Sequence, residues 1–405
     1  MTFEPEQPLP PGLTEPSSRL TNQVTDIDKE VAETATAETL NAVAAVVSSR
    51  PKVMEVPGTD ISKFMALQGT PRRQSMQGFD SDYVDIVDYI VRLTHRIWEE
   101  RNLGLLYTAY AHNIMIHTSE GMVYGRDKVM ADSVKSMAAY PDVRIYADEV
   151  IWTGNDRDGF HTSHRGVWAA RNTGYSNYGP PTGRQLVRRS VAHCIIKENY
   201  IVEEWITRDE LAVVWQLGFD AVELARKMAA RDAAAGIKSP VPVGTGEVDR
   251  LEGQTTPAAL PAKPTEFEIE AFVRRTNHEI WNWRMFGKVR DYYVANYDCS
   301  TTGNRTLHGW GDLEANIIQM LAAFPDGRKI IDHVCWMGDA QAGYRVAVRW
   351  YFQGTHLGPG FYGEPTGKRV KIIGVSHYLI QKGKFVKEWT QFDEFALLKQ
   401  IYWPI

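Results

Sequence analysis

Cysteine is scarce in the sequence, with three residues among 405. Cys194, Cys299 and Cys335 lie far apart and form no Cys-x-x-Cys pair, which excludes a disulfide framework and a thiolate zinc site. Long apolar runs are also missing. The most apolar early stretch, residues 32–47, is interrupted by Thr, Glu and Asn and falls short of the roughly 18 residues of a membrane span. Residues 1–13 lack the pattern of a secretory signal, so we expect a soluble cytoplasmic protein.

Excess positive charge is absent as well. The chain has 45 basic and 50 acidic residues and a net charge of −5. Nucleic-acid-binding proteins usually carry a basic face or stripe, and only short basic clusters such as residues 184–189 occur here. We therefore expect neither a nucleic-acid nor a membrane partner. The remaining composition, 43% hydrophobic and 11% aromatic, is typical of a globular protein of two or three domains.

The sequence contains an internal repeat. When the chain is shifted by 184 residues, residues 141–209 align with residues 325–393 without a gap, and 22 of the 69 pairs are identical. Residues 97–101 correspond to residues 280–284 at an offset of 183, so one residue was gained or lost between the two blocks. A repeat of this length predicts two copies of one domain.

The repeat divides the chain into four segments. We expect residues 1–79, rich in Pro, Thr, Ala and Glu, to be mostly disordered or loosely docked. Two domains are predicted over residues 80–222 and 264–405. Residues 223–263, which contain several prolines and glycines, are the predicted linker.

Within each unit, helical patterns precede strand-like ones. Amphipathic helices are predicted over residues 83–101 and 266–283, and second helices over residues 128–140 and 313–324. Runs rich in Val, Ile, Tyr and Trp follow in both units; those of the first unit are 143–153, 159–171, 184–196 and 200–209. Helices followed by an antiparallel meander predict an α+β fold in which the helices cover one face of a sheet.

Short motifs add a resemblance to this pattern. The second unit contains Phe324-Pro-Asp326, Gly354-Thr-His-Leu-Gly358, Pro365-Thr-Gly-Lys368, Gly383-Lys384, Glu388-Trp389, Asp393 and Leu397. With these residues it resembles the SnoaL-like polyketide cyclase family, part of the superfamily typified by nuclear transport factor two. The first unit matches less closely, at Tyr140-Pro-Asp142, Pro181-Thr-Gly183, Glu204-Trp205, Asp209 and Gln216-Leu-Gly218. Asn172 stands where the pattern has His356.

The resemblance implies two tandem cone-shaped domains, each a curved antiparallel sheet wrapped by N-terminal helices. It implies that the two copies pack as an intramolecular pseudo-dimer, with homo-oligomerisation left open. It also implies a cofactor-free pocket inside the cone, with an acidic residue near the end of the last strand as acid or base. The superfamily includes cyclases, isomerases, dehydratases, epoxide hydrolases and proteins that only bind, so the motifs specify the fold better than the activity.

Asp393 is the candidate base of the second unit, and His356 is its candidate partner. Turn arithmetic places Asp393 beside position 371, about 10 Å from His356 across one strand. Trp389 and Phe352 would form an apolar wall that raises the pKa of the carboxyl group towards the operating pH. The alternative is that Asp393 only caps a helix that begins at position 394.

The first unit offers a weaker version of this site. Asp209 is the repeat equivalent of Asp393 and a third candidate catalytic residue. Asn172 cannot transfer a proton, so we expect it at most to bind substrate. One unit could then be the working site and the other a structural partner.

The last hairpin decides which residues share a face of the sheet. A three-residue loop ending in Gly383 sets His377 opposite Lys387 and puts His377, Trp389 and Asp393 on one face. A two-residue loop sets His377 opposite Glu388 and puts Asp393 on the other face. We favour the three-residue loop, in which His377 contacts a distal part of a longer substrate.

Further candidate substrate-binding residues come in repeat-related pairs, His193 with His377, Arg165 with Arg349 and Trp205 with Trp389. Each pair also has a structural interpretation. The histidines could be buried, hydrogen-bonded sheet residues, the arginines could pair with carboxylates, and the tryptophans could belong to the core.

We expect no metal and no cofactor. The segment 358–363 fits the spacing of a dinucleotide-binding glycine motif, but it joins two strands and contains a proline. His161 and His164 would lie on opposite faces of one strand. The predicted function is a cofactor-independent acid/base enzyme (cyclase-like, isomerase, hydratase or lyase) on a small carbonyl or ester substrate. The alternative is a non-catalytic module that binds a small molecule or a protein.

Overall fold

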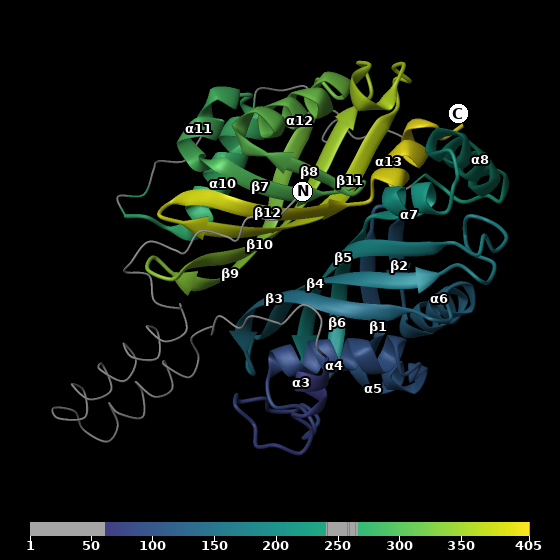
Figure 1. The fold of residues 1–405 in the computed structure, drawn as a ribbon, viewed down its shortest axis with the longest axis vertical. Coiled ribbons are helices and arrows are strands. Elements are labelled where there is room, and N and C mark those ends of the chain that lie inside the picture. The colour runs from purple at the N-terminus through teal and green to yellow at the C-terminus, as the bar shows by residue number, and fades with distance from the viewer. Residues whose placement is uncertain are drawn as a thin grey trace, which may run out of the picture.

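The computed structural model describes residues 61–239 and 266–404, together with positions 241, 257, 259 and 264. Two six-stranded sheets face one another, and helices α4 and α12 lie on their outer sides (Figure 1). The strand orders are β2-β1-β6-β5-β4-β3 and β8-β7-β12-β11-β10-β9. The second sheet thus repeats the first strand for strand, and the predicted tandem α+β fold is confirmed.

The first domain contains two long helices before its meander, as the sequence predicts. Its elements are α3 (Ser62–Met65), α4 (Ile86–Trp98), η1 (Leu103–Leu105), α5 (Leu106–Ala109), β1 (Tyr110–Thr118), β2 (Gly121–Tyr124), α6 (Arg126–Ala139), β3 (Arg144–Asn155), β4 (Gly159–Arg171), β5 (Gln185–Lys197), β6 (Tyr200–Arg208), α7 (Glu210–Gln216) and α8 (Ala221–Ala234). Helix α8 lies in what the sequence analysis takes as the start of the linker. Most of the rest of that linker, including residues 242–256, is outside the described residues.

The second domain repeats the order found from α4 to α7, with the short turns η2 and η4 added. Its elements are α10 (Ile269–Asn277), a π-helical turn η2 (His278–Asn282), η3 (Phe286–Lys288), α11 (Val289–Tyr292), β7 (Tyr293–Thr301), β8 (Arg305–His308), α12 (Gly309–Ala323), β9 (Arg328–Asp339), β10 (Gly343–Thr355), η4 (Gly360–Tyr362), β11 (Arg369–Gln381), β12 (Lys384–Phe392) and α13 (Glu394–Ile401).

Each sheet contains one parallel pair that the sequence analysis does not predict. Strand β1 runs parallel to β6, and β7 runs parallel to β12, so the sheets are mixed rather than wholly antiparallel. Both added strands show mixed polar and apolar residues and an irregular burial pattern. Such strands lack the clean alternation by which a half-buried strand is found in a sequence.

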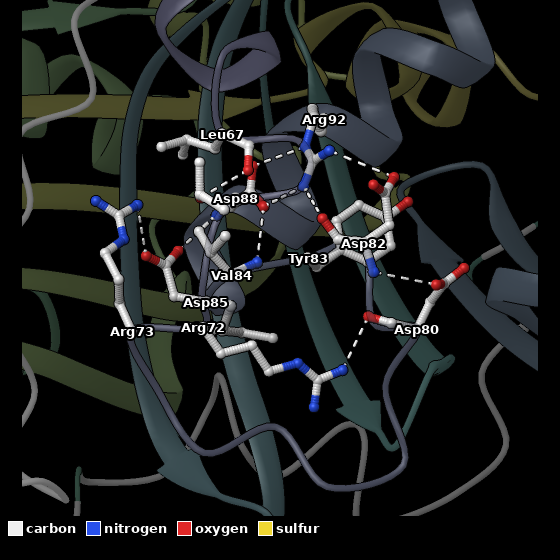
Figure 2. A network of polar contacts seen from close by, with 12 residues as sticks. Leu67, Arg72, Arg73, Asp80, Asp82, Tyr83, Val84, Asp85, Asp88 and Arg92 are labelled. Carbon is white, nitrogen blue, oxygen red and sulfur yellow. Dashed lines mark hydrogen bonds and ion pairs between the residues drawn. The ribbon is translucent and has the colours of Figure 1, made fainter.

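The predicted N-terminal segment is partly packed. Residues 1–60 lie outside the described residues, whereas Phe64, Met76 and Phe79 are buried in the core of the first domain. In the middle of α4, Arg92 is buried and pairs with Asp88 and with Asp82, which precedes the helix (Figure 2). This charged network fixes the chain that leads into the helix.

The last hairpin has the loop length of one alternative of the sequence analysis and places His377 and Trp389 on one face as in the other, but its register matches neither. Lys382 and Gly383 form a two-residue loop with φ values of 50° and 70°, and Gln381 pairs with Lys384. A bulge between Leu379 and Ile380 then shifts the register. His377 therefore pairs with Trp389, and the final pair of Gly374 with Phe392 places Asp393 two positions from where the sequence arithmetic puts it.

The two domains contact each other through their sheets and through the turns at the sheet edges. Strand β3 lies beside β9, and β6 lies against β11 and β12. The β1–β2 turn of the first domain contacts the second domain, where Gln400 Nε2 donates to the Ser119 carbonyl at 3.0 Å. In return, Gly303 N in the β7–β8 turn donates to Asp209 at 2.8 Å. Among the described residues, no helix combines the length and apolar character that a membrane crossing requires.

Candidate active site

A cavity lies inside the second domain, between its sheet and helix α12. Its volume of about 60 Å³ holds a few water molecules or a small chemical group. Aromatic side chains form much of its wall, and charged groups from β9 and β12 project into it. The residues that matter most for its chemistry are Trp281, Lys329, Trp350, Phe352, Tyr378 and Glu388.

Glu388 is a buried carboxylate held by a chain of hydrogen bonds. The hydroxyls of Tyr297 and Thr390 both donate to it. Thr390 in turn contacts the Ser376 hydroxyl at 2.6 Å, and Trp350 Nε1 donates to Ser376 at 2.9 Å. Because the indole can only donate and the carboxylate can only accept, the chain runs in one direction, towards Glu388. This arrangement fixes the position of the carboxylate.

Lys329 places an ammonium group in the same cavity. Burial lowers its pKa from 10.5 to about 8, although the charge of Glu388 acts in the opposite direction. Its Nζ lies 4.8 Å from the ring centroid of Trp281 and 4.3 Å from that of Trp350. The backbone of Lys329 is held by Asn282, whose side chain accepts from the lysine N–H at 3.0 Å. A lysine in this state can carry or release a proton near neutral pH.

Asp393, the candidate base of the sequence analysis, is the N-cap of α13. Its carboxylate accepts from Ala396 N at 2.8 Å. Burial raises the pKa of Asp393 well above its usual range, and the nearby carboxylates of Glu210 and Glu120 add to this. Its neighbour Glu394 lines the cavity, whereas Asp393 is not among the lining residues. The carboxyl group is thus perturbed, but it lies outside the cavity.

His356 and Asn172 hold the same loop in the two domains. His356 Nδ1 accepts from Thr366 N at 3.4 Å and contacts its hydroxyl at 3.2 Å. The Asn172 side-chain oxygen accepts from Thr182 N at 2.9 Å and from its hydroxyl at 3.1 Å. Burial lowers the pKa of His356, so the ring is neutral and suited to accept these bonds. Both residues therefore position the Pro-Thr-Gly loop.

Asp209 is fully engaged in hydrogen bonds. It caps α7 through Ala212 N at 3.2 Å, and it accepts from Gly303 N and Asn304 N of the second domain at 2.8 and 3.2 Å. Burial raises the pKa of Asp209, although these hydrogen bonds act in the opposite direction. Asp209 thus acts as a helix cap, the role that the sequence analysis gives as the alternative for Asp393, and its carboxylate also joins the two domains.

The remaining candidate binding residues meet at the interface of the two sheets, apart from Phe352, which lines the cavity. The Arg165 guanidinium lies 4.4 Å from the ring of Trp389, and that of Arg349 lies 3.4 Å from the ring of Trp205. Each arginine also pairs with an aspartate of its own domain, Arg165 with Asp148 and Arg349 with Asp332. The arginines thus pair with carboxylates, as the structural interpretation of the sequence analysis states, whereas the half-buried tryptophans contact arginines of the other domain instead of belonging to a core.

His377 lies in a buried polar cluster of the same interface. The Ser163 hydroxyl contacts its Nε2 at 2.8 Å, and its Nδ1 lies 2.9 Å from Glu149. Burial alone would raise the pKa of Glu149. The hydrogen bond from His377 and the charges of Arg165 and Arg345 outweigh this effect and lower that pKa to about 2. His193, the repeat equivalent of His377, is also buried at the interface.

Comparison with known proteins identifies the family. The family model described as SnoaL-like polyketide cyclase matches residues 88–217 and 271–401. The chain belongs to this family. Among solved structures, it resembles a SnoaL-like polyketide cyclase from Agrobacterium tumefaciens strain C58, with 20% identity, 34% of this chain and 99% of the other covered, and a TM-score of 0.28. It also resembles TsrD from Streptomyces laurentii, with 16% identity, 33% and 97% covered, and a TM-score of 0.29. Curated proteins give no match.

Sequence reasoning missed Lys329 and Glu388 as site residues, two of the charged residues that line the cavity of the second domain. Glu388 is part of the repeated Glu-Trp pair, and its alternation with Trp389 already puts the two side chains on opposite faces. Lys329 follows the Pro-Asp motif and replaces Ile145 of the first repeat. This difference between the two copies, a charged residue in one and an apolar residue in the other, is the signal that could have identified Lys329.

Proposed function

We propose that the second domain is a cofactor-independent acid/base enzyme of the cyclase type, acting on a small carbonyl or ester substrate. The observation that carries this proposal is that Glu388 and Lys329 project into one buried, aromatic cavity. A carboxylate and an ammonium group in such a place supply a base and a stabiliser of negative oxygen. Membership of the SnoaL-like family supports the same class of chemistry.

In this proposal, Glu388 accepts the proton from the carbon next to a substrate carbonyl. The Lys329 ammonium group stabilises the enolate oxygen that forms. Attack of that carbon on a second carbonyl closes a carbon–carbon bond and leaves an alkoxide, to which Lys329 gives a proton. Glu388 then returns its proton to Lys329, so that atoms and charges balance over one turnover.

Asp393 together with His356 is the second candidate pair. It is supported by the raised pKa of Asp393, which is the direction that a general base near neutral pH needs. Its position outside the cavity lining favours Glu388. The non-catalytic alternative, a module that uses the cavity only to bind a ligand, needs the cavity but no proton transfer.

Exchange of hydrogen for deuterium separates these candidates without a known substrate. Aromatic and aliphatic ketones and esters are incubated with the full chain in D₂O, and loss of the proton signal next to the carbonyl is followed by NMR. Glu388→Gln is expected to lower the exchange rate by about 10² or more. The matched change Glu204→Gln in the first domain is expected to leave it unchanged.

The opposite pattern defeats the assignment. If Asp393→Asn abolishes exchange and Glu388→Gln does not, the second pair is the catalytic one. If compounds bind in the second domain and the wild-type chain exchanges none of them, the non-catalytic alternative is favoured.

A further inference from the structure

Three histidines from both domains converge at the sheet interface, away from the cavity described above. His161 lies on β4 and His193 on the neighbouring β5, while His333 comes from β9 of the second domain. One ring nitrogen of each lies within 4.8 Å of the others. The rings of His161 and His333 are stacked with centroids 4.6 Å apart, and that of His193 lies 5.0 Å from His333.

Four of the six ring nitrogens in this cluster are buried without a hydrogen-bond partner among the described residues. Both nitrogens of His193 are buried without a partner among the described residues, and so is Nδ1 of His161 and of His333. Buried polar atoms are nearly always paired, and an unpaired one costs free energy. A cluster of such atoms from three residues therefore indicates a missing ligand that accepts their lone pairs.

The repeat supplies an internal control for this interpretation. At the repeat-related place of the interface, Glu149 corresponds to His333, Arg345 to His161 and His377 to His193. There the Glu149 carboxylate contacts His377 at 2.9 Å and Arg345 at 3.4 Å, so the ring and the charges find partners. The interface can thus be filled by complementary charges. In the histidine cluster the carboxylate and the guanidinium are both replaced by imidazoles.

We propose that His161, His193 and His333 bind one zinc ion that bridges the two domains. Imidazole nitrogen is a preferred zinc ligand, and sites with three histidines leave a fourth position for water. Tetrahedral zinc with bonds of about 2.0–2.1 Å needs its ligand nitrogens closer together than 4.8 Å, so binding requires the imidazole rings to turn towards one another. The nearest cation, Arg349, is paired with Asp332 and covered by Trp205.

Zinc binding is measured on the full chain after removal of metal with a chelator. Zinc chloride is titrated calorimetrically, the bound metal is counted by mass spectrometry after gel filtration, and cobalt(II) serves as a spectroscopic probe of coordination. The wild-type chain is expected to bind one zinc ion, to show the visible spectrum of four-coordinate cobalt, and to melt at a higher temperature when zinc is present.

His333→Gln is the main variant because this residue is only partly buried. It is expected to weaken zinc binding at least about tenfold and to abolish the cobalt spectrum. His193→Gln is the second variant, with its circular dichroism measured without metal to confirm folding. His112→Gln, an exposed histidine of β1, is the matched control and is expected to bind zinc as the wild type does.

Two results overturn the proposal. One is a wild-type chain that takes up no zinc at concentrations up to the millimolar range. The other is stoichiometric uptake that persists unchanged in folded His333→Gln and His193→Gln, which would place the metal elsewhere.

Discussion

The two domains share one strand order but differ in the side chains that each face of the sheet carries. Inside the second domain, Lys329 and Glu388 share a cavity, and Ser376 and Thr390 extend the hydrogen-bond chain from the carboxylate. In the first domain, the repeat-related residues of Lys329, Ser376 and Thr390 are Ile145, Ala192 and Ile206, which cannot form such a chain. Only the glutamate, Glu204, is retained, and burial raises its pKa.

The interface shows the same kind of divergence. Glu149, Arg345 and His377 form a charged, hydrogen-bonded cluster at one place, and three histidines occupy the repeat-related place. The fold therefore tolerates different side chains at equivalent positions, where one cluster pairs its charges and the other has imidazole nitrogens without a partner among the described residues. Duplication lets one copy keep an apolar interior while the other gains buried charged groups.

The largest effect on stability is expected for Glu149→Gln. Loss of the carboxylate leaves Arg345, Arg165 and His377 at the interface without their shared partner, and breaking a buried ion pair costs about 3–5 kcal/mol. His333→Gln, at the repeat-related position, is expected to change the unfolding free energy of the metal-free protein by less than about 1 kcal/mol. Denaturation in urea measures both, and equal losses would contradict the difference between the two clusters.

The Glu149 carboxylate is also expected to make the stability of the protein depend on pH in the acidic range. Because the pKa of Glu149 is lowered to about 2 in the folded chain, the unfolded chain binds a proton first as the pH falls. The stability that this residue contributes is present above its ordinary pKa of 4.5 and is lost between pH 4.5 and about 2. The difference in unfolding free energy between the wild type and Glu149→Gln should shrink over that range.

Lys329 is expected to affect the stability of the protein at alkaline pH, whereas Glu149 affects it at acidic pH. This effect distinguishes the interior of the second domain from that of the first. Its folded pKa of about 8 lies below its ordinary value of 10.5, so between these pH values the unfolded chain holds a proton that the folded chain lacks. Raising the pH from 8 to 10.5 therefore stabilises the wild type relative to Lys329→Met, by about 3 kcal/mol. Ile145→Met in the first domain is the matched control, and its difference from the wild type should not vary with pH.

A smaller effect is expected when one interface cluster is converted into the other. The double variant His161→Arg with His333→Glu recreates the Arg345 and Glu149 arrangement. Without metal, its unfolding free energy should lie at or above that of the wild type, because a paired arginine and glutamate replace imidazole nitrogens that lack partners. With zinc at 100 times the dissociation constant, the wild type should gain about 2.7 kcal/mol and the double variant nothing. A zinc response that survives the exchange would count against the three-histidine site.

The fold is predicted well because the repeat and the alternation of apolar residues can both be found directly in the order of residues along the chain. The helix at Glu394–Ile401 and the four meander strands follow from such local patterns. Strands β1 and β7 do not, since their parallel pairing with β6 and β12 depends on residues far away in the sequence. The bulge beside Leu379 is likewise set by packing, and it moves the register of the strand that leads to Asp393.

The site is harder to predict than the fold for a related reason. Motif matching selects Asp393 and His356, but a conspicuous residue can serve a cap or a loop as well as a reaction. One face of each sheet lines the interior of its own domain, and the other face contacts the neighbouring domain. Which face does which depends on how the two domains pack, and no single strand encodes this packing. The three histidines show this most clearly, because His333 reaches His161 and His193 only when the two sheets meet.

The smallest effect is expected for His356→Asn, which gives the second domain the residue of the first. The Asn172 amide already holds the equivalent loop through Thr182, so asparagine can replace the imidazole as acceptor. Stability should change by less than about 1 kcal/mol, and deuterium exchange on carbonyl compounds should proceed near the wild-type rate. Thermal unfolding and NMR measure the two quantities. A folded variant that loses exchange would restore His356 to the reaction and return the choice of base to Asp393.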